Sequence, residues 1–338
     1  MQQVPVIDIA PWFQGDLTAR AAVAGQIDAA CRECGFLTVR GHGIADALVR
    51  DIFEVTYAFF DLPIEEKARC DASKRQGGRG YYRLESKSHA RTRGQDAAPG
   101  DLRETFFAGA EPVPNDPYTA APGAARHFAP NVWPERPQRM RTVWQAYRGA
   151  CEALCNDLLR ITAQALDLPQ TWFDDKIDRP ISTLAAQHYP QLDRPPAPGQ
   201  VRSAAHTDFG TLTLLMTEDK PGGLQIQGRD GEWNDVKPVP GAFIVNLGDM
   251  MAQWTNDRWR STLHRVVNPP LNAGAAARRL SIVYFHQPNY DALIECIPSC
   301  CDSAHPPKYA PILAGEHLVE KLRQVDSVAK ERTAGVDS

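Results

Sequence analysis

The chain has 338 residues, of which 37 are Lys or Arg and 41 are Asp or Glu, for a formal net charge of −4. A chain of this length can bury about three quarters of its unfolded surface without disulfide support. Its basic residues are dispersed, which argues against a nucleic-acid partner. No stretch approaches ~18 consecutive apolar residues, and no basic region precedes an apolar core at the amino terminus. We therefore expect a cytoplasmic protein with no membrane segment.

The eight cysteines favour neither disulfides nor zinc. Cys31 and Cys34, like Cys151 and Cys155, fall at helical spacing in apolar segments, where free cysteine behaves as a small apolar side chain. No second Cys-x-x-Cys sequence completes a zinc site. One cluster near the carboxyl terminus is suited to a thiol assay, and its role stays open: Cys296, Cys300 and Cys301.

The first part of the chain alternates short strands with helices. Residues 4–9 indicate a strand, and rows of small apolar residues predict a helix from Ala19 to Cys34. Gly35 ends this helix, because glycine readily adopts the left-handed conformation that follows many helices. Residues 36–39 predict a second strand, and a second helix runs from Ala45 to Phe60.

Residues 73–100 are rich in Gly, Arg, Ser and Gln and predict a surface loop. The glycines at 77–80 do not form a phosphate loop, because the Lys-Ser/Thr ending and the strand-to-helix context are missing. A proline-rich segment, 111–137, leads into the longest predicted helix, Gln138 to Leu166. Its apolar residues recur every three or four positions, which predicts one buried stripe and a spine for a sheet.

From Thr183 onward the apolar period changes from helical to two. Many short strands between glycine and proline turns predict a double-sheet jelly roll, also called a double-stranded β-helix. The predicted fold is therefore mixed α/β (α+β), with a helical and β cap and a spine helix. The predicted segments are a cap at 1–120, a spine helix and connector at 121–180, a jelly-roll core at 181–292, and an extension at 293–338 with a helix from about Gly315 to Val325.

A His-x-Asp pair begins one of these strands. In an extended segment His206 and Asp208 point to the same face, and together they supply two of the three ligands of a 2-His-1-carboxylate Fe(II) site. His264, on a later strand-like run, is the best candidate for the third ligand. Asp249 could compete with Asp208 for the carboxylate position, but it ranks second and is expected to lie in a turn or to support the ligands. A lone His-x-Asp is more often a simple hydrogen-bonding pair, so the assignment needs a further element.

That element is Arg279-Leu280-Ser281, which begins another predicted strand. By the same alternation, the guanidinium of Arg279 and the hydroxyl of Ser281 lie side by side and make a carboxylate receptor. Without the metal ligands, the simpler interpretation would be an arginine whose stem packs on the surface while its charge stays in water.

In this order and on strand-like segments, His206-x-Asp208, His264 and Arg279-x-Ser281 resemble the 2-oxoglutarate- and Fe(II)-dependent dioxygenases of the isopenicillin N synthase-like family. The resemblance covers nearly the whole chain and includes a cap packed on the catalytic sheet. It implies that the two histidines and the aspartate bind Fe(II). It also implies that Arg279 and Ser281 hold the far carboxylate of 2-oxoglutarate, and that O₂ is the second cosubstrate.

The resemblance extends to other site residues. The family usually carries Asn-x-Tyr where this chain has Gln187-x-Tyr189. Tyr189 is therefore expected to contact 2-oxoglutarate, whereas the role of Gln187 stays open. Four residues are expected to contact substrate, two from weaker family signatures and two because they share the face of Ser281: Tyr82, Phe106, Phe285 and Gln287. Two other histidines, His42 in a glycine-flanked turn and His188 beside Tyr189, are expected to be structural.

By this resemblance the protein hydroxylates a C–H bond of a small molecule and releases succinate and CO₂, while desaturation and ring closure use the same oxidant. Two alternatives stay open. One is an oxidase of the same fold that needs no 2-oxoglutarate, in which Arg279 and Ser281 hold the substrate's own carboxylate. The other is a non-catalytic jelly-roll binding module. Neither the substrate's identity nor the oligomeric state can be inferred from the sequence.

Overall fold

Most of the strands form two sheets that pack face to face, and β13 (Leu293–Ile294) pairs with β14 (Ile312–Leu313) in a separate two-stranded sheet. The computed structural model describes residues 3–73, 75–90, 98–192 and 194–323. The large sheet has the order β1 (Val6–Asp8), β2 (Phe36–Arg40), β10 (Phe243–Leu247), β7 (Leu212–Thr217), β12 (Arg279–Phe285), β5 (Thr183–Tyr189), β4 (Glu104–Gly109), β3 (Gly80–Tyr82). The small sheet has the order β6 (Ser203–His206), β11 (His264–Val266), β8 (Leu224–Gln227), β9 (Trp233–Asp235). All neighbouring pairs in both sheets are antiparallel except β1 with β2. The predicted double-sheet fold is confirmed.

The two faces of the large sheet differ in polarity because side chains alternate along each strand. On the outer face Leu184, Leu214 and Ile282 are buried in an apolar core shared with the helices. On the inner face, which meets the small sheet, Thr217 and Ser281 share a hydrogen bond of 2.8 Å. Polar groups are therefore concentrated between the two sheets, where the candidate site lies.

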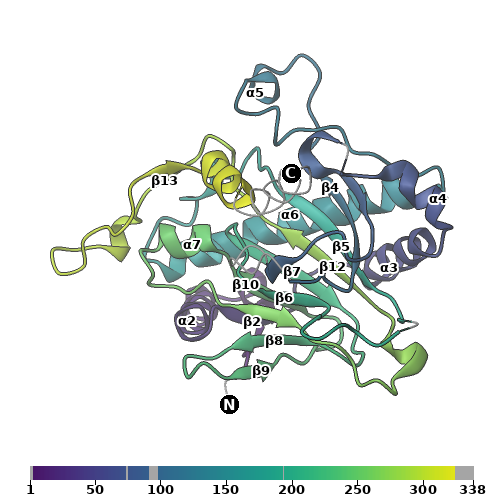
Figure 1. Cartoon of the computed structure of the whole chain (residues 1–338). Coiled ribbons are helices and arrows are strands. Elements are labelled where there is room, and N and C mark those ends of the chain that lie inside the picture. Colours follow the sequence, from purple (N-terminus) through teal and green to yellow (C-terminus); the bar gives the residue numbers. More distant parts are fainter. Residues whose placement is uncertain (1–2, 74, 91–97, 193, 324–338) are drawn as a thin grey trace, which may run out of the picture.

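Helices cover the outer face (Figure 1). The longest is α6 (Met140–Ala165), which contacts both α2 (Leu17–Glu33) and α3 (Asp46–Phe60). Its bounds agree with the predicted helix from Gln138 to Leu166 within two residues, because one apolar stripe is buried along most of its length. The shorter helices are α1 (Ala10–Gln14), α4 (Ile64–Lys67), α5 (Pro117–Ala120), α7 (Asp249–Trp254) and a carboxyl-terminal helix over 314–323.

Gly35 ends α2 as predicted, with a φ of +67°. A β-carbon at this position would lie 2.1 Å from the carbonyl oxygen of Arg260, so the backbone approaches too closely for any other residue. The turn directs the chain straight into β2, next to β10 in the large sheet.

The amino-terminal segment is more integrated than a cap. Its strands β1, β2, β3 and β4 extend the same large sheet as the predicted core, and one apolar cluster reaches from Ile7 to Ala314. Strand β3 also lies inside the segment predicted as a loop over 73–100. That part of the prediction was wrong, because hydrogen bonding to β4 imposes an extended conformation on a glycine-rich stretch. The arginines at 91 and 93 lie outside the described residues, as does the predicted end of the last helix at Val325.

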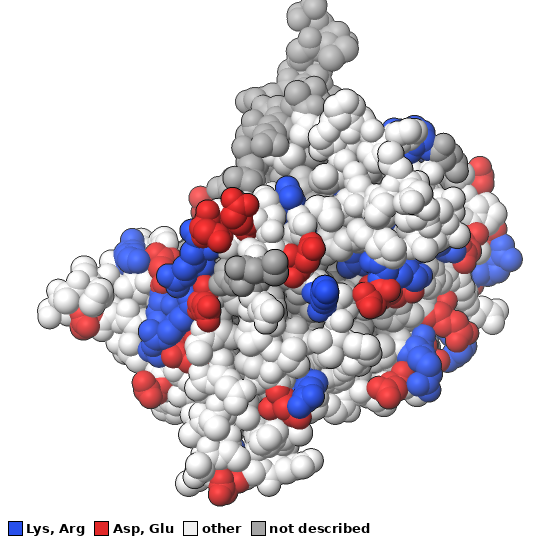
Figure 2. Space-filling model, turned by 90° about the horizontal axis from the view of Figure 1, so that it is seen from below, with Lys and Arg blue, Asp and Glu red and all other residues white. Residues whose placement is uncertain are grey.

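Acidic and basic side chains are interspersed on the face of the molecule seen in Figure 2, which carries no continuous basic patch among the residues described. Within the same described ranges, no helix combines the length and apolar character needed to cross a bilayer.

One buried charge cluster ties the outer face of the sheet to the helices. Glu104 on β4 accepts hydrogen bonds from Lys67 Nζ at 2.9 Å, from His188 Nδ1 at 2.8 Å and from the Tyr81 hydroxyl. Burial alone would raise the pKa of Glu104, but these three hydrogen bonds hold it below its usual value. Glu104 is therefore ionised in the folded protein, and its loss leaves Lys67 buried without an acidic partner.

Glu104→Gln is expected to lower the free energy of unfolding by about 3 kcal/mol at pH 7, measured by urea titration. Because the pKa of Glu104 is lower in the folded state, its contribution is fully present above the unfolded value of about 4.3 and is lost as pH falls. The difference between wild type and variant should therefore shrink below about pH 4. Glu66→Gln, at an exposed ion pair with Arg136, should leave stability nearly unchanged. A difference independent of pH would contradict the assigned charge.

Candidate metal centre

Two histidines and one aspartate converge between the sheets. His206 on β6 and His264 on β11 are directly opposed in the antiparallel ladder of the small sheet. Asp208 Oδ1 lies 3.8 Å from the Nε2 atom of each imidazole. The potential ligand atoms of the three residues all lie within 4.8 Å of one another. This spacing suits a single metal ion bound on one face by three protein ligands.

The strand that carries this pair is shorter than the sequence indicated. β6 ends at His206, and Asp208 lies in the irregular segment that leads to β7. Thr207 bonds to Asp249, outside the three-residue cluster, whereas His206 and Asp208 both belong to it, so the predicted alternation extends beyond the end of β6.

Backbone contacts fix the tautomer of both imidazoles. His206 Nδ1 donates to the carbonyl of Ala204 at 2.8 Å, and His264 Nδ1 donates to the carbonyl of Thr262 at 3.0 Å. Because a carbonyl only accepts, the proton sits on Nδ1 and the lone pair of Nε2 faces Asp208. Burial, and after it the charge of His264, lower the pKa of His206 to about 3. The His206 imidazole is thus neutral at physiological pH.

The second oxygen of Asp208 is held by the large sheet. Asp208 Oδ2 accepts hydrogen bonds from Asn246 Nδ2 at 2.8 Å and from Thr213 Oγ1 at 2.7 Å. Burial would raise the pKa of Asp208, but the two imidazoles and these hydrogen bonds lower it below its usual value. The carboxylate is therefore ionised, and its Oδ1 atom is directed toward the histidines.

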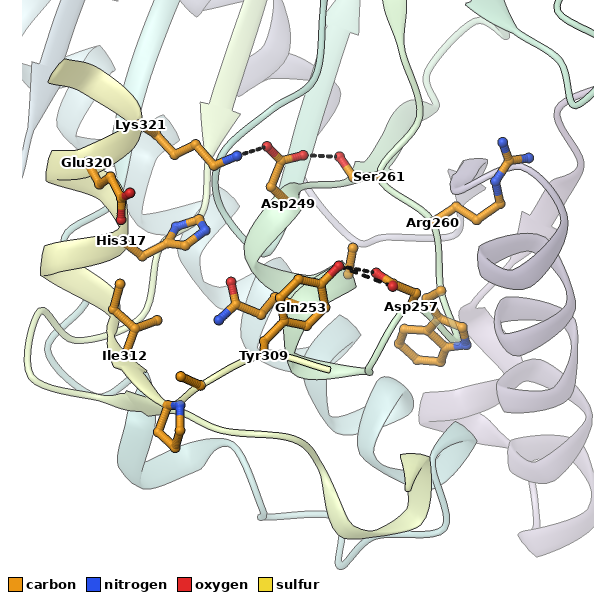
Figure 3. Close-up of a pocket in the computed structure, with 14 residues that line it drawn as sticks. Asp249, Gln253, Asp257, Arg260, Ser261, Tyr309, Ile312, His317, Glu320 and Lys321 are labelled. Carbon is orange, nitrogen blue, oxygen red and sulfur yellow. Dashed lines mark hydrogen bonds and ion pairs between the residues drawn. The ribbon is translucent and has the colours of Figure 1, made fainter. Parts of the chain in front are cut away.

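Asp249, the competing carboxylate, lies between Ser261 and Lys321 in a separate cavity (Figure 3). It accepts hydrogen bonds from Ser261 Oγ at 2.6 Å and from Lys321 Nζ at 2.8 Å, and it lines this cavity of about 740 Å³ with the carboxyl-terminal helix. Its Oδ2 atom also accepts from Thr207, and its backbone N–H donates to the carbonyl of Asp208 at 2.7 Å. Asp249 therefore supports the irregular segment that carries Asp208, and it is not part of the three-residue cluster.

A buried guanidinium lies farther along the inner face. Arg279 is 2% exposed, and its Nε and Nη2 atoms donate to Thr217 Oγ1 at 3.0 and 2.8 Å. Thr217 also shares a hydrogen bond with Ser281, so the side chains of Arg279 and Ser281 do share a face. The guanidinium Cζ atom of Arg279 lies 5.6 Å from the ring centre of Tyr189. Sequence reasoning missed Thr217, although the alternation of β7 places it on this face.

Gln187 lies in register with Ser281 on one side and with Thr105 on the other. All three side chains are buried on the inner face. Gln187 Oε1 and Thr105 Oγ1 have no hydrogen-bond partner among the described residues. Unpaired buried polar atoms are rare in folded proteins, so these two are suited to contact a ligand. Thr105 was not predicted, since only the register of β4 with β5 reveals it.

The predicted substrate contacts divide into two groups. Tyr82 and Phe285 are half-buried on the inner face, and Gln287 is buried with its Oε1 atom unpaired among the described residues. Phe106 is 0% exposed on the opposite face, among the aromatic side chains under α6. The prediction for Phe106 was wrong, because the alternation of β4 directs its neighbour Phe107 to the inner face instead, edge-on to Tyr82.

A third histidine lies at the edge of the cluster. The ring of His89 stacks on that of His206 with centroids 3.8 Å apart, and its Nδ1 atom lies 3.0 Å from Ser203 Oγ. Arg103 Nη2 donates to Asp101 Oδ2 at 3.1 Å beside it. His89 and these polar neighbours therefore restrain the ring of His206. His89 comes from the segment predicted as a loop, and no sequence signal distinguished it.

His42 and His188, which were expected to be structural, form hydrogen bonds away from the three-residue cluster. His42 bonds to the Gly241 carbonyl at 2.8 Å, and His188 bonds to Glu104 on the outer face. All eight cysteines are free thiols, five of them buried. In the carboxyl-terminal cluster, burial raises the pKa of Cys296 to about 12, which disfavours the reactive thiolate.

Comparisons with known proteins agree with this arrangement. Residues 4–136 match the model of the non-haem dioxygenase in morphine synthesis N-terminal family, and residues 180–288 match the 2OG-Fe(II) oxygenase superfamily. The chain is 34% identical to the 2-oxoglutarate-Fe(II) type oxidoreductase hxnY of Emericella nidulans over 91% of this chain and 86% of that protein. It is 32% identical to homoarginine-6-hydroxylase 2-ODD-233 of Oryza sativa subsp. japonica, over 94% and 96%.

Solved structures give the same result. A full-length Neurospora crassa protein, crystallised in complex with alpha-KG and thymine, superimposes with a TM-score of 0.79 and 28% identity, covering 96% of both chains. A putative 2OG-Fe(II) oxygenase family protein from Caulobacter crescentus superimposes with a TM-score of 0.83 and 26% identity, over 96% of this chain and 100% of that one. On the match of both family models, the near full-length relatives and the shared fold, this chain belongs to the 2OG-Fe(II) oxygenase superfamily.

Proposed function

We propose that His206, Asp208 and His264 are the Fe(II) ligands of this dioxygenase, and that Arg279 and Ser281 bind the far carboxylate of its cosubstrate 2-oxoglutarate. One observation carries the assignment: the Nε2 atoms of two imidazoles and one carboxylate oxygen face a common point, with their other polar atoms already engaged. This donor set fits Fe(II), because three ligands on one face leave open positions for small molecules.

Bound Fe(II) and 2-oxoglutarate supply an oxidant for a C–H bond. The reaction balances as substrate C–H, O₂ and 2-oxoglutarate giving substrate C–OH, succinate and CO₂. Hydroxylation is the proposed outcome, and desaturation or cyclisation would follow if geometry presents a different bond. The chain itself binds, orients and shields the reactants.

The protein's contribution comes from preorganisation. Asn246 and Thr213 hold the Asp208 carboxylate, and main-chain carbonyls orient both imidazoles, so no ligand needs to rotate on binding. Thr217 aligns the Arg279 guanidinium beside Ser281 and Tyr189. We infer that Tyr189 covers the chain of 2-oxoglutarate and that Gln187, with its unpaired oxygen, contacts bound ligand from the neighbouring strand.

The substrate is proposed to be a small molecule that rests against Tyr82, Phe107, Phe285 and Gln287. Relatives support the size class, since their names and titles refer to homoarginine and thymine. The first alternative, an oxidase without 2-oxoglutarate, is not favoured, because the relatives and the solved complexes are named for this cosubstrate. A non-catalytic module is not favoured either, because the same relatives are named as oxidoreductases and hydroxylases.

Two further expectations remain predictions from the sequence: the cytoplasmic location, and the division of the chain into segments at 1–120, 121–180, 181–292 and 293–338.

Replacing any of the three proposed ligands should abolish metal binding. His206→Ala, Asp208→Asn and His264→Ala are each expected to weaken binding of Mn(II), an oxygen-stable substitute for Fe(II), by at least about 100-fold in anaerobic calorimetric titration. Iron-dependent succinate release should be lost in parallel.

Two control variants test whether the loss of metal binding is specific to the three proposed ligands. His305→Ala removes an exposed histidine and should bind metal as wild type does. Asp249→Asn replaces the carboxylate that faces Lys321 and should retain binding. If Asp249→Asn loses the metal while Asp208→Asn keeps it, Asp249 is the carboxylate ligand.

Arg279→Gln is expected to raise the dissociation constant of 2-oxoglutarate by about 10- to 100-fold, because charge-assisted hydrogen bonds contribute about 1.5–3 kcal/mol. Metal affinity should not change. Titration of 2-oxoglutarate into the metal-loaded protein gives both values. Failure of the wild-type protein to bind 2-oxoglutarate would rule out the proposed cosubstrate site, and unchanged binding by Arg279→Gln would rule out this anchor.

A further inference from the structure

A second buried arginine lies beside the proposed 2-oxoglutarate anchor. Arg202 precedes β6 and the metal ligands by a few residues, and it is 2% exposed. Its guanidinium Cζ atom lies 5.2 Å from the ring centre of Tyr189, compared with 5.6 Å for the Cζ atom of Arg279. Two guanidinium groups therefore contact the same aromatic ring in the interior of the protein.

The two arginines share a hydrogen-bond acceptor. Arg202 Nη1 donates to the carbonyls of Pro221 and Gly222 at 3.0 and 2.9 Å, and its Nη2 atom donates to the carbonyl of Ala277. Arg279 Nη1 donates to the same Gly222 carbonyl at 2.7 Å. Arg202 thus joins the loop after β7 to the residues that lead into β12, and it fixes the oxygen that orients Arg279.

Gly222 shows how closely these groups approach. It has a φ of +74°, and a β-carbon there would lie 2.9 Å from Arg202 Nη1 and 2.5 Å from the backbone nitrogen of Pro269. No other residue can occupy this position without moving the loop. The position of the shared carbonyl is therefore determined by close packing around Arg202.

The pair has no direct acidic partner among the described residues, although the carboxylates of Glu218 and Asp219 are near enough to act on Arg279. Neither Arg202 nor Arg279 forms an ion pair with any acidic side chain in the described part of the chain, and their direct partners are carbonyls and Thr217. The nearby Glu218 is already engaged by Lys220 at 2.8 Å and by the backbone N–H of Leu280. Burial, and after it the charge of Arg279, lower the pKa of Arg202 to about 10, so it remains protonated at neutral pH.

Two like charges in the interior repel each other, and a bound anion between or beside them would offset this repulsion. We propose that Arg202 is a positioning residue of the 2-oxoglutarate site: it fixes the Gly222 carbonyl that aligns Arg279, and its charge makes the anchor selective for a dicarboxylate. This inference rests on the proposed function. A purely structural Arg202 would stabilise the loop without affecting the preference between ligands of different charge.

The test compares two ligands that differ only at the anchored end. 2-Oxoglutarate has a far carboxylate, and 2-oxopentanoate has a methyl group in its place. Dissociation constants are measured anaerobically on the Mn(II)-loaded full chain, by titration for the first ligand and by competition for the second. Arg202→Gln is expected to weaken 2-oxoglutarate by at least about 10-fold, because a nearby charge and its hydrogen bonds contribute more than ~1.4 kcal/mol. Binding of 2-oxopentanoate should change by less than about 2-fold.

Arg260→Gln is the matched control. Arg260 also donates to a main-chain carbonyl, that of Glu33 at 3.0 Å, but it lines the separate cavity of Figure 3. This variant should preserve both dissociation constants. Thermal unfolding and Mn(II) affinity of each variant show whether the fold and the metal site are intact.

Arg202→Lys tests the role of the charge separately from the role of the hydrogen bonds. It also tests the inference if the glutamine variant fails to fold. It keeps the charge but cannot bond to all three carbonyls, so it should weaken 2-oxoglutarate several-fold while preserving the preference for the dicarboxylate. A lysine variant that binds as wild type does would overturn the positioning role, and one that loses the preference would overturn the role of charge. If wild type binds 2-oxoglutarate and Arg202→Gln keeps the wild-type ratio of the two constants, the inference fails while the proposed function stands. If wild type does not bind 2-oxoglutarate, both fail.

Discussion

The carboxylate of Asp208 connects the two sheets, and the site depends on it. One oxygen accepts hydrogen bonds from Asn246 and Thr213 on neighbouring strands of the large sheet, while the other faces the histidines of the small sheet. A buried carboxylate is stable only with such partners, and here they also determine which oxygen remains for a metal. The same interactions therefore connect the two sheets and orient the Asp208 carboxylate.

The two faces of the large sheet differ in their balance of polar and apolar groups, although a smaller apolar cluster that includes Phe36, Ile226 and Ile244 also lies between the sheets. The outer face packs against α2, α3 and α6, and its apolar burial supplies most of the stabilisation, since hydrophobic burial is the dominant favourable contribution to folding. The inner face keeps charges and unpaired polar atoms in the interior, where each has a high cost without a ligand. The closely packed outer layer supports the inner layer, which holds buried groups such as Arg202 and Arg279 in positions that favour bound anions. Stability and binding thus come from opposite sides of one sheet.

Alternation along a strand predicted much of the site but not all of it. It placed Arg279 and Ser281 on one face, and the structure shows both at Thr217. It could not decide between Phe106 and Phe107, because two adjacent aromatic residues satisfy either face and only pairing with β5 determines which is inward. It also treated Asp208 as part of a strand, whereas β6 ends at His206. Such local departures depend on contacts from distant segments, among them the backbone of Asp249.

The amino-acid sequence by itself determined the class of fold, the bounds of the long helix and the residue types of the metal cluster. These follow from local periodicity and from motifs whose chemistry needs particular side chains. Only the tertiary structure decided that the amino-terminal strands extend the large sheet, that Asp208 rather than Asp249 faces the histidines, and that Arg202 meets Arg279 at one carbonyl. The physical reason is that strand order, register and loop packing arise from contacts between residues far apart in the chain, which no local pattern encodes.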